Sequence, residues 1–129
     1  MPSKDVYTFV LVHGAWHGGW CWGLVAQILR ARGHHVSAPT LTGLGERAHL
    51  LTEHIDFETF VLDVQNHIKT ERLRDVVLVG HSFGGNVVTV VADKIVDRIK
   101  RLIFLDASLP EDGLCIMDQL LLQISFRIQ

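Results

Sequence analysis

Short apolar runs alternate along the chain with longer segments whose apolar residues recur at helical spacing. The apolar runs lie at residues 7–12, 35–38, 76–79 and 102–105. The first of them has no alternation with polar positions, which is typical of a strand covered on both faces, as in a parallel sheet. Helical spacing extends over residues 20–32, 57–68 and 88–99.

The order of these elements predicts an α/β fold. Strands that alternate with helices are joined by right-handed crossovers, which gives a parallel sheet with helices on both faces. We expect Asp56 to cap the helix that follows it and Gly33 to end the first helix. The connection at residues 40–55 is long for a compact domain, and loops of that length more often have a function. Residues 113–129 again show apolar helical character.

Composition excludes several classes of protein. The 129 residues allow one domain, and 48% hydrophobic against 20% charged residues is enough for a buried core. A net charge of −2 argues against a nucleic-acid partner, since such proteins carry a basic surplus. No apolar stretch has the length of a signal or a membrane span, and Cys21 and Cys115 lie too far apart for a CxxC pair. We expect a soluble, cytoplasmic protein with no membrane partner.

The pentapeptide at residues 80–84, Gly-His-Ser-Phe-Gly, is the sharpest chemical motif. It matches G-x-S-x-G and stands directly between a predicted buried strand and a predicted amphipathic helix, which is the context the motif requires. The sharp turn would hold Ser82 clear of the sheet, and Gly80 and Gly84 would let the strand and helix backbones approach. The helix would point its positive end toward developing negative charge. Ser82 is therefore the candidate nucleophile.

A second motif, at residues 13–16, ends the first predicted strand. Its sequence is His-Gly-Ala-Trp. Acyl transfer needs two backbone N–H donors aimed at the oxyanion. One would come from Phe83, the residue after the nucleophile, and the other from Ala15 in this loop. Together the two motifs predict a serine nucleophile with an oxyanion hole.

With these motifs the sequence resembles the α/β-hydrolase superfamily, and within it the small esterases that include plant methylesterases and hydroxynitrile lyases. The matching stretches are FVLVHGAWHGGW at residues 9–20, GLGER at 43–47, VLVGHSFGG at 77–85 and LDA at 105–107. The resemblance implies hydrolysis of a small-molecule carboxylic ester through an acyl-enzyme, with Ser82 as nucleophile. It further implies a substrate pocket formed by His13, Gly14, Trp16, His81 and the loop at residues 40–55.

The resemblance also implies that catalytic groups lie outside this sequence. In this fold the nucleophile is followed by an acid and then a histidine, and no histidine follows Ser82. We expect residues 1–110 to form the N-terminal part of the hydrolase core and residues 111–129 the truncated start of a cap segment. His17 is the histidine to test as a substitute base, and Asp106 could orient a histidine.

Two other functions remain open. The chain could be a catalytically inactive remnant or a binding module, because the base and acid are missing. It could also be similar to a hydroxynitrile lyase, although lyases of this kind tend to carry threonine where this chain has Gly14, which favours ester hydrolysis.

No metal or cofactor is expected. The eight histidines lack cysteine partners at ligand spacing, and His13-x-x-x-His17 lies in a glycine-rich loop rather than on a helix. Serine chemistry needs no cofactor. The family's fold also implies the strand order 35–38, 7–12, 76–79, 102–105. The last strand would then form an open apolar edge, which favours self-association.

Overall fold

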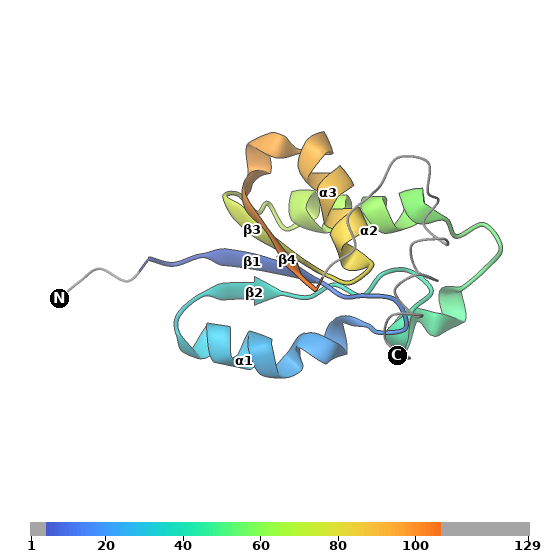
Figure 1. Ribbon diagram of the computed structural model, residues 1–129, viewed down its shortest axis with the longest axis horizontal. Helices are drawn as coiled ribbons and strands as arrows, with labels where there is room; N and C mark the ends of the chain where they lie inside the picture. The colour runs from blue at the N-terminus through green and yellow to red at the C-terminus, as the bar shows by residue number, and fades with distance from the viewer. Residues whose placement is uncertain (1–4, 107–129) are drawn as a thin grey trace.

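The computed structural model describes residues 5–106, and its centre is a four-stranded parallel sheet (Figure 1). The strands are β1 (Thr8–Val12), β2 (His35–Ser37), β3 (Val76–His81) and β4 (Ile99–Leu105). Their order across the sheet is β2-β1-β3-β4, and every neighbouring pair runs parallel. The predicted α/β class, strand positions and strand order are confirmed.

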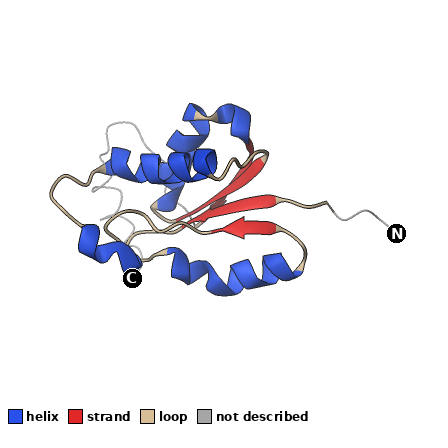
Figure 2. Ribbon diagram, turned by 180° about the vertical axis from the view of Figure 1, so that it is seen from behind, coloured by secondary structure: helices blue, strands red, loops and turns tan. Residues whose placement is uncertain are grey.

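Three α-helices cover the sheet, α1 (Gly23–Ala31), α2 (Phe57–Thr70) and α3 (Gly84–Lys94). Helix α1 lies on one face of the sheet, and α2 and α3 lie together on the other (Figures 1 and 2). Short 3-10 helices also occur, namely η1 (Gly19–Trp22), η2 (Gly45–Leu50) and η3 (Val96–Arg98). None of the helices described over residues 5–106 has the length and apolar composition needed to cross a membrane.

The core consists of one cluster on each face of the sheet. Val10 and Val12 point into the cluster beneath α2 and α3, whereas Leu11 packs with Trp22 on the α1 face. Successive side chains of a strand point to opposite faces, so a strand with layers on both sides is apolar throughout. This is why the run at residues 7–12 shows no alternation.

The start of α2 agrees with its predicted cap. The Asp56 carboxylate accepts a hydrogen bond from the Thr59 backbone N–H at 3.0 Å, and the Thr59 hydroxyl accepts one from the Asp56 backbone N–H at 3.2 Å. This reciprocal pair is a capping box, which satisfies donors that a helix start otherwise leaves unpaired.

Two expectations about helices were wrong in detail. Residues 20–32 form η1 followed by α1 rather than one helix. The helix after the G-x-S-x-G motif begins at Gly84, directly after the turn as expected, but it ends at Lys94 rather than continuing to residue 99, because Ile95 leaves the helical region at φ −130° and ψ 48°; Ile99 belongs to β4. The long loop at residues 40–55 contains η2. The cap segment expected at residues 111–129, the helical pattern at 113–129 and Cys115 lie outside the described residues.

Candidate active site

Ser82 occupies the turn between β3 and α3 in a left-handed backbone conformation, at φ +54°. Residues with a side chain rarely adopt positive φ, and such conformations concentrate at functional sites. The Ser82 carbonyl accepts a hydrogen bond from the Gly85 N–H at 3.0 Å, which starts the helix immediately after the turn. Ser82 is 8% exposed. The structure therefore shows the strand–turn–helix context that the G-x-S-x-G motif predicts.

The two glycines of the motif stand where the backbone is most crowded. A Cβ atom at Gly84 would lie 2.6 Å from the Val12 carbonyl oxygen and 2.8 Å from that of His13. A Cβ atom at Gly80 would lie 2.7 Å from the Gly84 carbonyl oxygen. Contacts this short are with backbone atoms that cannot rotate away. Both glycines are required for α3 to pack this closely on β1 and β3.

Gly14 brings the loop after β1 directly against the nucleophile. A Cβ atom at Gly14 would lie 2.9 Å from Ser82 Cβ and 3.4 Å from Ser82 Oγ. The adjacent residue, Ala15, is thus on the loop that touches Ser82, as an oxyanion donor must be. The second expected donor, Phe83, stands at the N-terminus of α3, and its ring packs edge-on against those of Phe57 and Phe60 at centroid distances of 6.2 and 5.8 Å. The donor roles of Ala15 and Phe83 stay predictions.

The buried His13 side chain connects the Gly14 loop to a neighbouring segment through hydrogen bonds. Its ring is fully buried, with Nδ1 2.8 Å from the Gly14 carbonyl oxygen and Nε2 3.0 Å from the Leu41 backbone nitrogen. Since the Leu41 N–H must donate to Nε2, the ring's proton is on Nδ1 and donates to Gly14. Burial lowers the pKa of His13 below its usual value. A neutral His13 therefore ties the Gly14 loop to the segment that begins at Thr40.

A polar network links the same loop to η2. Thr40 Oγ1 accepts a hydrogen bond from the Gly19 N–H at 2.8 Å and donates to the Glu46 carboxylate at 2.8–2.9 Å. Arg47 Nη1 donates to the Thr40 carbonyl oxygen at 2.8 Å. A Cβ atom at Gly19 would overlap the Ala38 carbonyl oxygen, so the backbone at Gly19 packs directly against the backbone that follows β2.

Asp63 of α2 completes this attachment, since its carboxylate accepts from the Thr42 N–H at 2.7 Å and from the Thr42 hydroxyl at 2.6 Å. Sequence reasoning missed the parts played by Thr40, Glu46 and Asp63. For Glu46 the available signal was the GLGER stretch at residues 43–47, which the resemblance marked without giving it a physical role; Thr40 and Asp63 lie outside that stretch.

The residues expected to line the substrate pocket differ in their position and exposure. His81 lines a cavity of about 220 Å³ together with His17, Cys21, Trp22, Val25 and Leu105. The His17 and His81 rings lie with centroids 6.2 Å apart. Trp16, at φ +69°, is 80% exposed. The structure thus brings Gly14, His81 and Ser82 together, whereas His13 lies beneath them and Trp16 at the surface.

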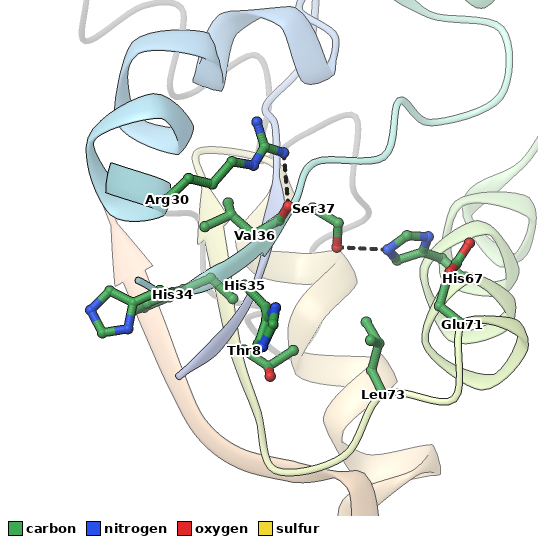
Figure 3. Close-up of a pocket in the computed structure, with 10 residues that line it drawn as sticks. Thr8, Arg30, His34, His35, Val36, Ser37, His67, Glu71 and Leu73 are labelled. Atoms are coloured by element: carbon green, nitrogen blue, oxygen red, sulfur yellow. Dashed lines mark hydrogen bonds between the residues drawn. The ribbon is translucent and has the colours of Figure 1, made fainter. Parts of the chain in front are cut away.

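A larger hollow, of about 460 Å³, lies at the opposite end of the sheet (Figure 3). It is lined by Thr8 and His35, where β1 and β2 begin, and by the end of α2, where His67 Nε2 lies 2.8 Å from Ser37 Oγ. Ser82 follows the other end of a parallel strand, so this hollow is not part of the candidate site. Over residues 5–106 no three His, Cys, Asp or Glu side chains are grouped as a metal site would need.

The buried His13 predicts loss of stability in acid. In the unfolded chain its pKa is near the ordinary 6.5, and burial lowers it in the folded state. The unfolded state then binds more protons, so the free energy of unfolding falls as the pH drops below about 6.5, down to the folded-state pKa. Urea unfolding between pH 7.5 and 5 would measure this slope.

The matched variants for that measurement are His13→Gln and His54→Gln. His13→Gln should have a lower free energy of unfolding than the unaltered protein at pH 7, but should lose less of it as the pH falls. A residual slope should remain, because burial also lowers the pKa of His67. The His54 ring is exposed, so the stability of His54→Gln should change with pH as that of the unaltered protein does. Equal slopes for all three proteins would contradict the role given to His13.

Residues 9–128 match the profile described as the alpha/beta hydrolase family, and the chain belongs to that family. It is 56% identical over 106 residues to a carbendazim hydrolyzing esterase of Nocardioides sp. (strain SG-4G), a match that covers 82% of this chain and 44% of that protein. Methylesterase 2 and alpha-hydroxynitrile lyase of Arabidopsis thaliana are each 37% identical, over 84 and 81% of this chain and 42 and 41% of theirs.

Among solved structures, an extracellular alpha/beta-hydrolase from a Paenibacillus species superposes with a TM-score of 0.76 and 40% identity. The superposition covers 83% of this chain and 43% of that one. The described sheet and helices are thus part of an α/β-hydrolase fold. The chain spans less than half the length of these relatives.

Proposed function

We propose that Ser82 is the nucleophile of a serine esterase that cleaves small carboxylic esters. The observation that carries the proposal is the positive φ of Ser82 between β3 and α3, with the Gly14 loop packed against its side chain. Esterases among the similar proteins support the substrate class.

In the proposed reaction Ser82 Oγ attacks the ester carbonyl carbon while a general base takes its proton. The N–H groups of Ala15 and Phe83 donate to the oxygen that becomes negative, and the positive end of α3 adds to this stabilisation. The tetrahedral intermediate collapses, and the alcohol leaves with a proton from the base. Water then attacks the acyl-enzyme by the same route and releases the acid and the serine.

The base and its orienting acid belong, in this proposal, to the part of the hydrolase fold that the relatives carry beyond the matched region. No histidine follows Ser82 in this sequence. His17 and Asp106 are the alternatives within the chain. Asp106 follows β4 at the same end of the sheet as Ser82, at φ +44°.

Gly14 favours hydrolysis over the lyase alternative. A side chain at this position would begin 2.9 Å from Ser82 Cβ and would crowd the space beside the hydroxyl. A glycine leaves that space to the acyl group and to the attacking water.

The test uses residues 1–106 fused to the portion of the Nocardioides esterase that lies beyond the match. We expect the fusion to hydrolyse p-nitrophenyl acetate or butyrate faster than the octanoate ester. Carbendazim is a further substrate to test, because the Nocardioides relative is a carbendazim hydrolyzing esterase. Cleavage of mandelonitrile without ester hydrolysis would favour the lyase. A folded fusion inactive on all of them would favour the inactive remnant or binding module.

A further inference from the structure

All four strands begin at the same end of the sheet, on the left in Figure 1. The registers of the parallel pairs align the strand starts with one another. The segments that lead into the strands, residues 5–8, 30–35, 69–76 and 96–101, therefore lie together, and we call them the strand-start end. Ser82 follows the other end of β3.

Charge is segregated between the strand-start end and the rest of the described chain. The four segments carry eight Lys or Arg residues against four Asp or Glu, whereas the remainder of residues 5–106 carries two against seven. A chain of net charge −2 thus presents a surplus of four positive charges at one end. Charges gathered in this way produce a local potential that attracts anions.

Helix ends explain only part of this surplus. Three of the eight basic residues lie in the last turn of a helix, where a positive side chain offsets the helix dipole. Arg72, Arg74, Lys100 and Arg101 lie outside helices, and all four are exposed. Within residues 5–106 none of these four forms an ion pair with a carboxylate. Their charges are therefore available to an anionic partner.

Exposed aliphatic side chains lie among the charges of this end. Val6, just before β1, is 59% exposed, and Val96, just before β4, is 71% exposed. Basic residues mixed with exposed apolar ones are typical of a surface that binds at a membrane interface, where the basic groups contact lipid phosphates and the apolar groups enter the headgroup region. A nucleic-acid backbone or an acidic peptide offers the aliphatic side chains much less.

Two hollows at the strand-start end indicate what kind of anion fits. The hollow of about 460 Å³ shown in Figure 3 is lined by Arg30, and a neighbouring one of about 490 Å³ by Arg32. His34 lines both, but Glu71 lines the first and Asp5 the second. Within each hollow one carboxylate thus balances one arginine. The positive surplus lies on the surface around the hollows, which fits a broad anionic surface better than a single small anion.

We propose that the strand-start end binds an anionic membrane surface, with its basic side chains against lipid phosphates and Val6 and Val96 among the headgroups. The expectation of no membrane partner came from the lack of a long apolar stretch, which binding at a membrane surface does not require. In this orientation the turn that holds Ser82 faces away from the lipid and stays open to dissolved molecules. The proposal does not depend on the activity of Ser82.

The experiment mixes the full chain with vesicles of phosphatidylcholine alone, or of phosphatidylcholine with about one third of anionic phosphatidylglycerol, and measures the bound fraction by sedimentation. We expect binding to the anionic vesicles and not to the neutral ones, with release at about 0.5 M NaCl because salt screens the attraction. No binding to the anionic vesicles would overturn the proposal. Equal binding to both kinds would also overturn it and would point to the exposed apolar residues of α1.

Matched double variants locate the surface. Arg72→Gln with Arg74→Gln changes exposed positions, so the circular dichroism of the chain should stay the same while binding to anionic vesicles weakens at least tenfold. The control is His49→Glu with His54→Glu, which lowers the net charge by the same amount at exposed positions of the loop at residues 40–55. The control should bind as the unaltered chain does, and equal weakening by both double variants would contradict binding through the strand-start end.

Soluble polyglutamate separates a membrane from an acidic polypeptide. Vesicle binding that persists in polyglutamate at an equal concentration of negative charge would support the proposal. Vesicle binding abolished by that polyglutamate, or binding to polyglutamate with none to vesicles, would overturn it in favour of an acidic polypeptide partner.

Discussion

Replacing Ser82 by alanine is expected to abolish ester hydrolysis by the fusion that completes the fold. Without Oγ no acyl-enzyme can form, and what remains is the modest acceleration from oxyanion donors and substrate positioning. By analogy with serine hydrolases that lose their nucleophile, kcat should fall by about 10⁴-fold or more. The measurement is the steady-state release of p-nitrophenol from the acetate ester, with the protein's folding checked by circular dichroism.

Ser37→Ala is the matched control for that result. Its hydroxyl lies 2.8 Å from His67 Nε2 (Figure 3), at the end of β2, and β1 separates β2 from β3 and its serine turn. The same chemical change there should leave kcat within about twofold, because neither Ser37 nor His67 takes part in the proposed reaction. Hydrolysis that survives Ser82→Ala at more than a few per cent would contradict the nucleophile assignment.

Replacing Gly84 by alanine is expected to destabilise the fold strongly. The added Cβ would meet the carbonyl oxygens of Val12 and His13 at 2.6 and 2.8 Å, and both belong to the backbone of β1 and the loop that follows it. Relief requires α3 to move away from the sheet, with loss of packing by Val87 and Val88. Overpacking of this kind costs roughly 1–3 kcal/mol, and contact with rigid backbone should bring the loss to the upper end.

Gly23→Ala tests whether the effect comes from the contact rather than from replacing a glycine in a helix. A Cβ atom at Gly23 would meet nothing within 4 Å, and the residue is already helical at φ −51°. Alanine is the better helix former, so this variant should gain roughly 0.4–1 kcal/mol. Urea unfolding measures both variants, and a Gly84→Ala protein as stable as Gly23→Ala would contradict the close packing of α3 on β1.

Much of the fold could be predicted from the sequence because its strands are short, apolar and separated by helical patterns. The serine turn could be predicted because backbone crowding requires glycine at positions 80 and 84. Those two glycines around Ser82 form a motif that is visible in the sequence. The end of α3 at Lys94 could not be predicted, since the next residue, Ile95, is buried and apolar and continues the helical pattern. Periodicity identifies which residues are apolar but not where the backbone leaves the helix.

The exposure of α1 and the network around Thr40 were also beyond sequence reasoning. In the sequence, an apolar stripe such as Trp20, Leu24 and Ile28 predicts a face buried in the core, and it does so equally when the face is exposed in the structure. The hydrogen bonds from Gly19 to Thr40 and from Thr42 to Asp63 join residues 21 positions apart, and no local pattern reveals them. The loop at residues 40–55 could be marked as functional by its length alone.

The central claim is that Ser82 acts as the nucleophile beside two backbone donors. Its most direct test is a crystal structure of the completed fusion after reaction with a fluorophosphonate. We predict a covalent bond from Ser82 Oγ to phosphorus, with the phosphonyl oxygen about 3 Å from both the Ala15 and Phe83 nitrogens. An adduct on another residue, or a phosphonyl oxygen turned away from these two N–H groups, would contradict the claim.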